Sequence, residues 1–241
     1  MDDNTGQPGS AQTGTLPRTA PPRAITAWIR AGTLDAELAA LTSIMIESGL
    51  PLVVAASGDA QANGWTGVEA RDAVGQSLLS CAPQPGPAVR TPSPVCVEAG
   101  SLEAVLARMP ILSLDAADEL GARVAIVVVL GIDEPEDAWR VTAAHLLRPP
   151  LRDGHGHLQR QGPAVLATWD PALRRFEHFA WAVLPELAAL IDRRAGDLEA
   201  DINARTDLLA GLVAHRIDDA GAVRLAVEAA RTVADAAAHR H

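Results

Sequence analysis

Three residues in the stretch LPLVVAASGDAQANGWTG, Leu50 to Gly67, have the types and spacing to bind a phosphate: Gly58, Gly64 and Thr66. A phosphate-binding loop holds phosphates with backbone N–H groups and a helix N-terminus, neutralises them with a lysine, and binds Mg²⁺ with a Ser or Thr hydroxyl. The apolar run that precedes the glycines is typical of a buried strand. Nucleotide binding is therefore the first chemistry to consider.

The same loop departs from the pattern at the residues that carry charge. Trp65 stands where the lysine is expected, Asp59 adds a negative charge, and one residue too many separates the glycines for G-x4-G-K-[ST]. The 20 basic residues are all arginines, whose guanidinium differs in size and geometry from an ammonium. We therefore predict that Gly58, Gly64 and Thr66 are the remnant of a nucleotide loop, kept as a strand-to-helix turn without productive ATP binding.

Other residues could be catalytic or bind a metal, but the sequence does not supply the further ligands or triad members that such a site needs. His155 and His157, beside Asp153, could bind a metal, but they fall in an expected hairpin turn with no further ligand, so a solvated turn is favoured. His178 is expected to be a packed or edge residue of the last strand. No serine has the context of a Ser-His-Asp triad, and no Gly-x-Ser-x-Gly motif occurs. We expect no catalytic residue and no metal.

Composition and charge limit the kinds of partner. With 30 acidic and 20 basic residues the net charge is -10, which disfavours nucleic acid and anionic membranes. Cys81 and Cys96 have neither metal-ligand spacing nor a disulfide framework. The chain opens on a polar stretch rather than a signal peptide, and its most hydrophobic run, Val124 to Ile132, is too short to span a bilayer. We expect a cytoplasmic protein without membrane insertion, whose partner is a protein.

The elements that must position the loop follow an α/β order. Residues 1–24 are polar and are expected to form a disordered tail. Hydrophobic periodicity then predicts a helix from Thr33 to Ser48, a strand from Leu50 to Ala56 that is buried on both faces, and a helix from Val68 to Ser80. The prolines of Ala82–Pro94 indicate a loop.

The rest of the chain is predicted to form strands and then helices. The expected elements are a strand at Pro94–Glu98, helices at Ser101–Met109 and near Asp115–Leu120, a strand at Ala122–Ile132, and an antiparallel meander of Arg140–Leu147, His157–Gln161, Ala164–Trp169 and Arg175–Phe179. From Trp181 onward the pattern is helical, with breaks near Gly196 and around Asp218–Gly221. We therefore divide the chain into an α/β domain with a β-meander over 25–180 and a helical region over 181–241.

Aromatic residues gather in the last hairpin and just after it. These are Trp169, Phe176, Phe179 and Trp181. Because large aromatic side chains bury well, the simplest expectation is that they form the core of the hairpin. A surface that binds a partner is the second.

Several of these stretches resemble the secretion ATPases, the P-loop enzymes of type II and type IV secretion and of pilus assembly. GTLDAELAALTSIMIESGLPLVVAASG is similar to the helix, strand and loop entry that precede the family's Gly-Ser-Gly-Lys-Thr loop. AGSLEAVLARM resembles the helix after the family's histidine box, AVLATWDPALRRFEHFAW its late meander, and RTDLLAGLVAHRIDDAGAVRLAVEAA its closing helical pair. The matches follow the family's order over residues 25–230.

The resemblance implies a partial RecA-like P-loop core, that is, a mixed sheet with flanking helices, followed by an antiparallel β-meander and C-terminal helices. The family uses ATP and Mg²⁺, but Glu69 and Asp72 are the only acids between Thr66 and Pro94, where the family carries the carboxylates that hold Mg²⁺. Glu98 stands where the family has a histidine, and the family's N-terminal domain is not expected here. We therefore expect no cofactor.

The favoured function is that of a non-catalytic pseudo-ATPase, an interaction or regulatory subunit of a type II or IV secretion or pilus system. Its partner would be a full-length secretion ATPase or the membrane platform that such an ATPase engages. The alternative is a divergent P-loop ATPase that still binds ATP and Mg²⁺ and completes its site in trans from a neighbour. A third hypothesis is that the chain is the product of a decaying gene. The family's ring is a hexamer, and a homo-oligomer is left open.

Overall fold

The computed structural model describes residues 20–83, 93–108, 125–149, 151–155, 157–159 and 161–238. The expectations for the tail up to residue 19, for most of the proline-rich loop and for the helix near 115–120 fall outside these residues. The residues from 20 onward lead into helix α1 (Ile25–Arg30). Ala24, the residue just before this helix, is buried.

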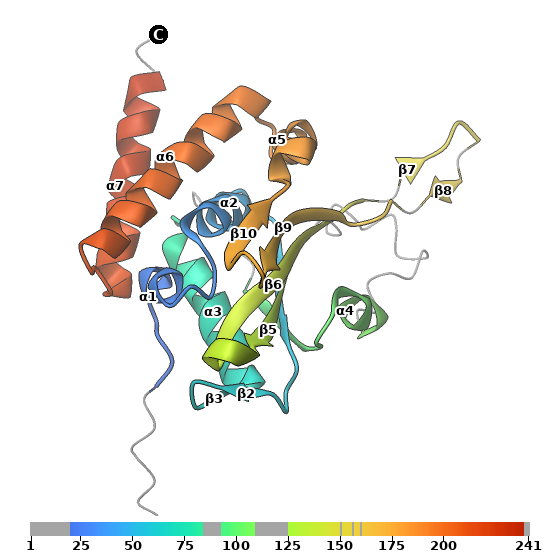
Figure 1. Ribbon diagram of the computed structural model, residues 1–241. Helices are drawn as coiled ribbons and strands as arrows, with labels where there is room; N and C mark the ends of the chain where they lie inside the picture. The colour runs from blue at the N-terminus through green and yellow to red at the C-terminus, as the bar shows by residue number, and fades with distance from the viewer. Residues whose placement is uncertain are drawn as a thin grey trace, which may run out of the picture.

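A six-stranded mixed sheet forms the centre of the protein (Figure 1). Its strands lie in the order β10 (Arg175–His178), β9 (Ala164–Asp170), β6 (Ala138–Leu147), β5 (Ala125–Asp133), β1 (Leu52–Ala56) and β4 (Val95–Glu98). β4, β1 and β5 are parallel to one another, and β6, β9 and β10 continue from β5 as antiparallel neighbours. The α/β class and the mixed sheet predicted from the sequence are therefore confirmed. The predicted antiparallel meander is confirmed for β6, β9 and β10, but the strand predicted at His157–Gln161 is not part of it, because β8 (Leu158–Gln159) pairs with β7 (Leu151–Arg152) in a separate two-stranded sheet.

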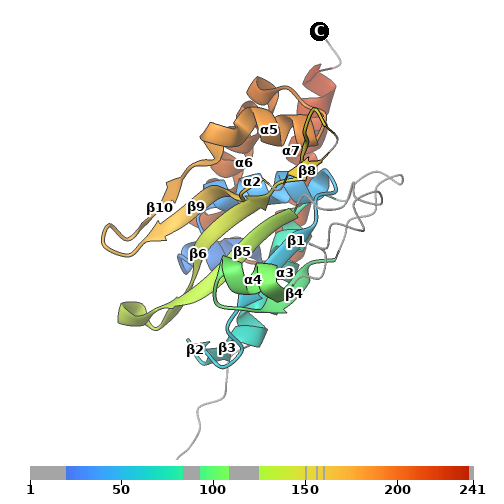
Figure 2. The ribbon, with the colours of Figure 1, turned by 90° about the vertical axis from the view of Figure 1, so that its right-hand side faces the viewer.

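Helices pack on both faces of this sheet. One face contacts α4 (Leu102–Arg108) through Val105, as Figure 2 shows from that side. The helices that share a core with the other face are α1, α2 (Ala36–Glu47), α3 (Gly67–Cys81), α5 (Leu184–Leu190), α6 (Ala195–Ala214) and α7 (Ala220–Ala238). Shorter elements are β2 (Gln61–Ala62), β3 (Trp65–Thr66), β7 (Leu151–Arg152), β8 (Leu158–Gln159) and the 3-10 helices η3 (Glu134–Glu136) and η4 (Ala180–Val183).

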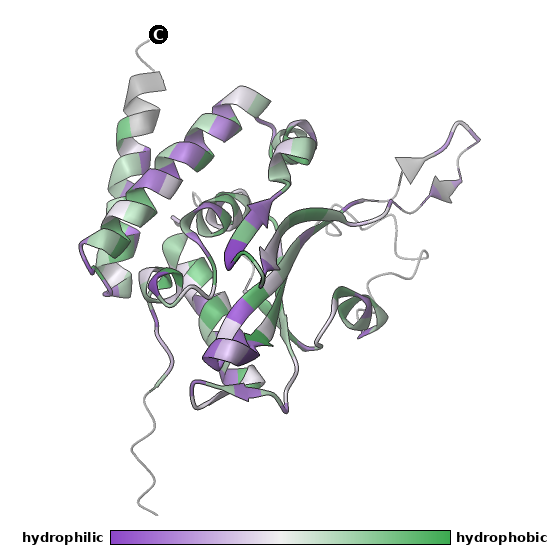
Figure 3. Cartoon of the chain, in the orientation of Figure 1, coloured by the Kyte–Doolittle hydropathy of each residue, from purple (hydrophilic) through white to green (hydrophobic). Residues whose placement is uncertain are grey.

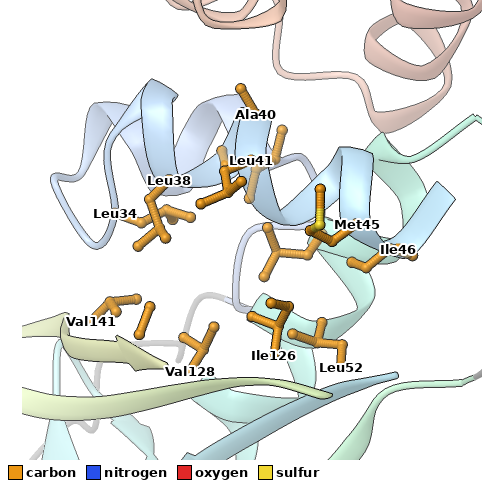
Figure 4. Close-up of a cluster of buried hydrophobic side chains, with 14 of the residues drawn as sticks. Leu34, Leu38, Ala40, Leu41, Met45, Ile46, Leu52, Ile126, Val128 and Val141 are labelled. Carbon is orange, nitrogen blue, oxygen red and sulfur yellow. The ribbon is translucent and has the colours of Figure 1, made fainter. Parts of the chain in front are cut away.

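The alternation of side chains along β1 separates two cores. Leu52 and Val54 point toward α2 and α3, whereas Val53 and Ala55 point toward α4. Because both faces of the strand are covered, the sequence is apolar at every position, and the predicted burial on both faces is confirmed. Figure 4 shows side chains of α2 packed against this sheet, and Figure 3 shows hydrophobic residues along the central strands.

The helix predicted over Thr33–Ser48 is confirmed as α2, with a later start. Asp35 is its N-cap and accepts a hydrogen bond from the N–H of Leu38 at 2.9 Å. Thr33 is buried ahead of the helix, and its carbonyl accepts from the N–H of Val141 at 2.7 Å. The chain before the cap is therefore tied to β6 rather than to α2.

The two breaks predicted in the C-terminal helices are confirmed to within a few residues. Gly196 lies inside the first turn of α6, and the break precedes it, where Asp192 has a left-handed φ of 53°. The second break is shifted toward the N-terminus, because Gly221 lies inside α7 and Arg216 is the left-handed residue after α6. In the described part of the chain no helix is long and apolar enough to cross a membrane.

The predicted aromatic core of the hairpin is only partly right. Trp169 and Phe176 do pack together, with ring centroids 5.0 Å apart. Phe179 is 37% exposed and Trp181 is 74% exposed, so the expectation that they are core residues is wrong. The reason is that η4 turns the chain at the end of β10, so that Ala180 faces the core in place of Trp181.

Candidate functional site

The candidate site lies at the carboxyl ends of β1 and β4. These strands are parallel neighbours, but the helices that follow them, α3 and α4, pack on opposite faces of the sheet. In open α/β sheets, ligands bind beyond the carboxyl ends of two neighbouring strands whose following helices lie on opposite faces of the sheet. The loop that begins at Ser57 and Gly58 leaves β1 at this point, so the fold places the predicted nucleotide loop where a ligand would be expected.

The loop itself forms a small hairpin rather than an open phosphate cradle. β2 and β3 pair antiparallel through Gln61 with Thr66 and Ala62 with Trp65. The two residues between them, Asn63 and Gly64, have φ values of 54° and 75°. Left-handed backbone at both positions is the geometry of a type I′ turn, for which Asn-Gly is the preferred pair. Gly64 is therefore explained by the turn.

Thr66 and Glu69 close the N-terminus of α3 between them. The N–H of Glu69 donates to Thr66 Oγ1 at 3.3 Å, while both the N–H and the hydroxyl of Thr66 donate to Glu69 Oε2 at 2.8 Å. This is a capping box, in which side chains satisfy the amides that begin a helix. The N–H of Gly67 is also used, because it donates to Ala60 O at 2.9 Å. A carboxylate of the chain therefore occupies the helix end that would attract a phosphate.

Two glycines permit close approaches around the loop. A side chain on Gly67 would place its Cβ 1.9 Å from Ser57 O, so the turn into α3 requires glycine. A Cβ on Gly58 would lie 2.8 Å from the carboxyl carbon of Glu98. The glycine thus makes room for the Glu98 side chain, which reaches across from the end of β4.

Trp65, at the position expected for lysine, is partly buried and packs against the core. Its ring meets that of Trp28 edge to face with centroids 5.4 Å apart. Its carbonyl accepts a hydrogen bond from Trp139 Nε1 at 3.3 Å, which ties the β2–β3 hairpin to β6. The residue that breaks the lysine pattern is therefore an anchor of the hairpin.

The charges around the loop are negative. Asp59 is exposed within it, Glu69 caps the helix that follows, and Glu98 lies against Gly58. These carboxylates would repel a phosphate, because like charges at short range are unfavourable. Among the described residues, no group of three or more His, Cys, Asp and Glu side chains is placed to hold a metal ion. The site thus lies at strand ends where α/β sheets bind ligands, but the side chains around it carry negative charge.

The histidines named by the sequence have structural contacts. The carboxylate of Asp153 accepts the N–H groups of His155 and His157 at 2.9 Å each, which ties the backbone of both histidines to Asp153. His178 Nε2 lies 2.7 Å from Asp35 Oδ2, and its Nδ1 lies 3.5 Å from Glu37 Oε1. The ring therefore links β10 to the start of α2.

The structure brings together some of the predicted residues. Gly58 and Thr66 lie on either side of the hairpin at the start of α3, whereas a Cβ on Gly64, at its tip, would meet no atom within 4 Å. The sequence contains the signals for this arrangement. Asn63-Gly64 is a hairpin pair, and Thr66-x-x-Glu69 is a capping box. For buried residues such as Arg140, the sequence contains no comparable local motif that would predict their position.

Comparison of the chain with protein-family models finds no match, and comparison with curated protein sequences also finds none. The resemblance to secretion ATPases therefore rests on the quoted stretches of this sequence.

Proposed function

We propose that this chain is a non-catalytic, secretion-ATPase-like protein with a partial RecA-like core, which acts in the cytoplasm by binding another protein. The observation that carries the proposal is the capping box of α3. The Glu69 carboxylate accepts the backbone N–H and the hydroxyl of Thr66, at the helix end that a P-loop offers to phosphate. ATP could bind there only by displacing the carboxylate and breaking the cap.

Further features support the loss of nucleotide chemistry. Thr66, the candidate Mg²⁺ ligand, already donates its hydroxyl to Glu69, and Trp65 is committed to packing against Trp28. The chain has no lysine that could replace the missing one. The position of the loop, between a central parallel strand and its helix, favours descent from a nucleotide site over an unrelated turn.

The partner we propose is a full-length secretion ATPase or the membrane platform that it engages. This part rests on the resemblance of the meander and the closing helices to the family. The exposed aromatic residues after β10 support a binding role, because Trp side chains contribute strongly to protein interfaces.

Thermal unfolding with and without Mg-ATP tests the non-catalytic part. A chain that bound ATP at one hundred times its Kd would gain about 2.7 kcal/mol, which raises the melting temperature by roughly 5–10 °C for a protein of this size. We expect no rise beyond that of a control with Mg²⁺ alone. A rise that depends on both ATP and Mg²⁺ would favour the divergent ATPase that completes its site in trans.

Co-purification tests the partner. The chain is mixed with a full-length secretion ATPase from the same source, and separately with the cytoplasmic part of the platform protein, and each mixture is resolved by size-exclusion chromatography. We expect co-elution with one of them. Separate elution from both, by a cooperatively folded chain, would contradict the proposed partners.

A further inference from the structure

The imidazole ring of His178, on β10, lies between two carboxylates that belong to the start of α2. Its Nε2 lies 2.7 Å from Asp35 Oδ2, and its Nδ1 lies 3.5 Å from Glu37 Oε1. The side chain is only 17% exposed, because β10 and the start of α2 lie side by side at this point (Figure 1). Both ring nitrogens of one histidine therefore face acidic oxygens.

This arrangement fits the protonated ring. A neutral imidazole has one N–H donor and one lone pair, whereas an imidazolium donates from both nitrogens. A lone pair that faced a carboxylate would be repelled by it, so both contacts are favourable only while the ring carries its second proton. In that state the contact with Asp35 is a charge-assisted hydrogen bond, and the contact with Glu37 is an ion pair.

The charged groups that face the ring come from α2. On β9 the residue opposite His178 is Ala167, which is apolar and fully buried. On β10 itself, Glu177 lies 3.8 Å from Arg175. Because successive side chains of a strand point to opposite faces, these two side chains lie on the other face of the sheet from the ring. The two carboxylates of α2 therefore decide whether the ring keeps its proton.

Asp35 serves the ring and the helix at once. Its Oδ1 accepts the N–H of Leu38 at 2.9 Å as the N-cap of α2, while its Oδ2 contacts His178. The cap fixes the position of the carboxylate and with it the counter-charge of the ring. Burial lowers the pKa of His178, but the hydrogen bond with Asp35 and the charges of Asp35 and Glu37 raise it by more, so the pKa lies above 6.5.

The strand that this contact holds is short and lies at the end of the sheet. β10 has four residues and is the last strand in the six-stranded order. Phe176 packs on Trp169, and the N–H of Phe179 donates to Leu166 O at 2.8 Å. A short strand at an edge opens at a lower free energy than a central strand. A side-chain link from β10 to α2 therefore changes how often this strand opens.

We propose that His178 is a pH-sensitive switch that holds β10 to the start of α2. While both ring nitrogens carry a proton, both carboxylates bind the ring. When the ring gives one proton to water, one nitrogen presents a lone pair and the opposite charges no longer attract. β10 then separates from α2 more often, together with the exposed Phe179 and Trp181 that follow it.

Amide hydrogen exchange of the full chain tests the switch, followed by NMR and expressed relative to the intrinsic exchange rate at each pH. The N–H of Phe179 reports on β10, and the N–H of Val54, in the middle of β1, is the reference. We expect the protection of Phe179 to fall at least about threefold between about pH 6 and about pH 8.5, and that of Val54 to fall less. His178→Gln keeps a side-chain N–H but no charge, so its protection should not depend on pH.

Two further variants separate the switch from other effects. Asp35→Asn keeps the cap of α2, because asparagine and aspartate are similarly good N-caps, but it removes the counter-charge of the ring. We expect it to weaken the pH dependence at Phe179 and to keep the protection of Leu38. His157→Gln is the matched control, because it removes a histidine whose side chain is 79% exposed, and it should leave the pH dependence unchanged.

Titration of the His178 ring by NMR gives the second readout, with an expected midpoint above 6.5. Constant protection of Phe179 over this pH range, an equal fall in His178→Gln, a fall no larger than that of Val54, or a ring midpoint at or below 6.5 would each overturn the switch. The switch is independent of the proposed binding function, since neither ATP nor a partner enters this experiment.

Discussion

The indole rings of Trp28 and Trp65 meet edge to face, with centroids 5.4 Å apart and planes inclined at 66°. Trp28, on α1, is fully buried, and its Nε1 donates to Pro22 O at 3.1 Å and to Ser77 Oγ at 3.2 Å. Through this contact the β2–β3 hairpin joins the core formed by α1 and α3. The residue that replaces the expected lysine therefore stabilises the fold.

Replacing Trp65 by lysine tests this role. We expect Trp65→Lys to lower the free energy of unfolding by about 2 kcal/mol, because it removes a partly buried ring and brings an ammonium toward Trp28. The melting temperature should fall by roughly 4–8 °C. No Mg-ATP stabilisation should appear, since Glu69 still caps α3.

Trp181→Lys is the matched control, because it makes the same change at a ring that is 74% exposed. We expect it to change the free energy of unfolding by less than about 0.5 kcal/mol. Equal losses for the two variants, or Mg-ATP binding by Trp65→Lys, would show that Trp65 is not a structural substitute for the lysine.

The capping box gives a second prediction, measured by urea denaturation. Thr66→Ala should cost about 1 kcal/mol, because the first amides of α3 lose a hydrogen-bond partner. Glu69→Ala should cost a similar amount, while Glu69→Gln, which keeps the capping hydrogen bonds, should cost much less. The double variant Thr66→Ala with Glu69→Ala should lose less than the sum, because the residues act together. Strict additivity would contradict a reciprocal cap.

Much of the fold could be predicted because local sequence and tertiary contacts agree. The continuous apolar run of β1 matches its burial on both faces, and the spacing of apolar residues in α2 matches its packing on the sheet. α1 was not predicted, since a helix of six residues gives too little periodicity to detect. The break before α6 lies slightly ahead of the predicted position, Gly196, because the left-handed residue of the turn, Asp192, is not a glycine.

The site was only partly predictable because the same residues fit both a phosphate loop and two local motifs, a hairpin turn and a helix cap. Gly58, Gly64 and Thr66 fit part of a phosphate loop, but Asn63-Gly64 also fits a hairpin turn and Thr66 with Glu69 also fits a capping box. The buried position of Arg140 could not be predicted. The burial of Arg140 depends on how β6 and the α1–α2 loop come together, and one of its partners, the carbonyl of Ala31, is 109 positions away in the sequence.

His178 gives a third prediction, on pH. Burial lowers its pKa, but the hydrogen bond with Asp35 and the charges of Asp35 and Glu37 raise it by more, so the pKa lies above the ordinary value of 6.5. A raised pKa means that the folded state binds the proton more tightly than the unfolded state. The stabilisation is therefore complete below 6.5 and is lost as the pH rises through the raised value.

The free energy of unfolding of the wild type and of His178→Gln, measured from about pH 6 to pH 8.5, tests this sign. Their difference should shrink as the pH rises, because the wild type alone loses a charged interaction with Asp35. His145 acts in the opposite direction: burial lowers its pKa, so its contribution is lost as the pH falls below 6.5. A difference that stays constant with pH would show that His178 does not pair as a cation.

Glu47 gives the last prediction, because it joins α2 to both C-terminal helices. One of its carboxylate oxygens accepts from Arg205 at 2.9 Å and the other from Arg231 at 2.8 Å. Arg205 is 11% exposed and also donates to Ser43 Oγ, so Glu47→Gln would leave a nearly buried guanidinium without its counter-charge. We expect a loss of about 2 kcal/mol, measured by thermal and urea unfolding.

The control for Glu47 is Glu228→Gln on α7. Glu228 lies 3.8 Å from Arg224 at the surface, where an ion pair contributes little, so its loss should stay below about 0.5 kcal/mol. Glu47→Gln should in addition speed amide exchange in α6 and α7 more than in β1, because the bridge holds these helices on α2, whereas β1 is held by α2, α3 and its two neighbouring strands. Equal stability losses for the two variants, or exchange that rises equally in β1, would show that the bridge does not hold the helical region to the α/β core.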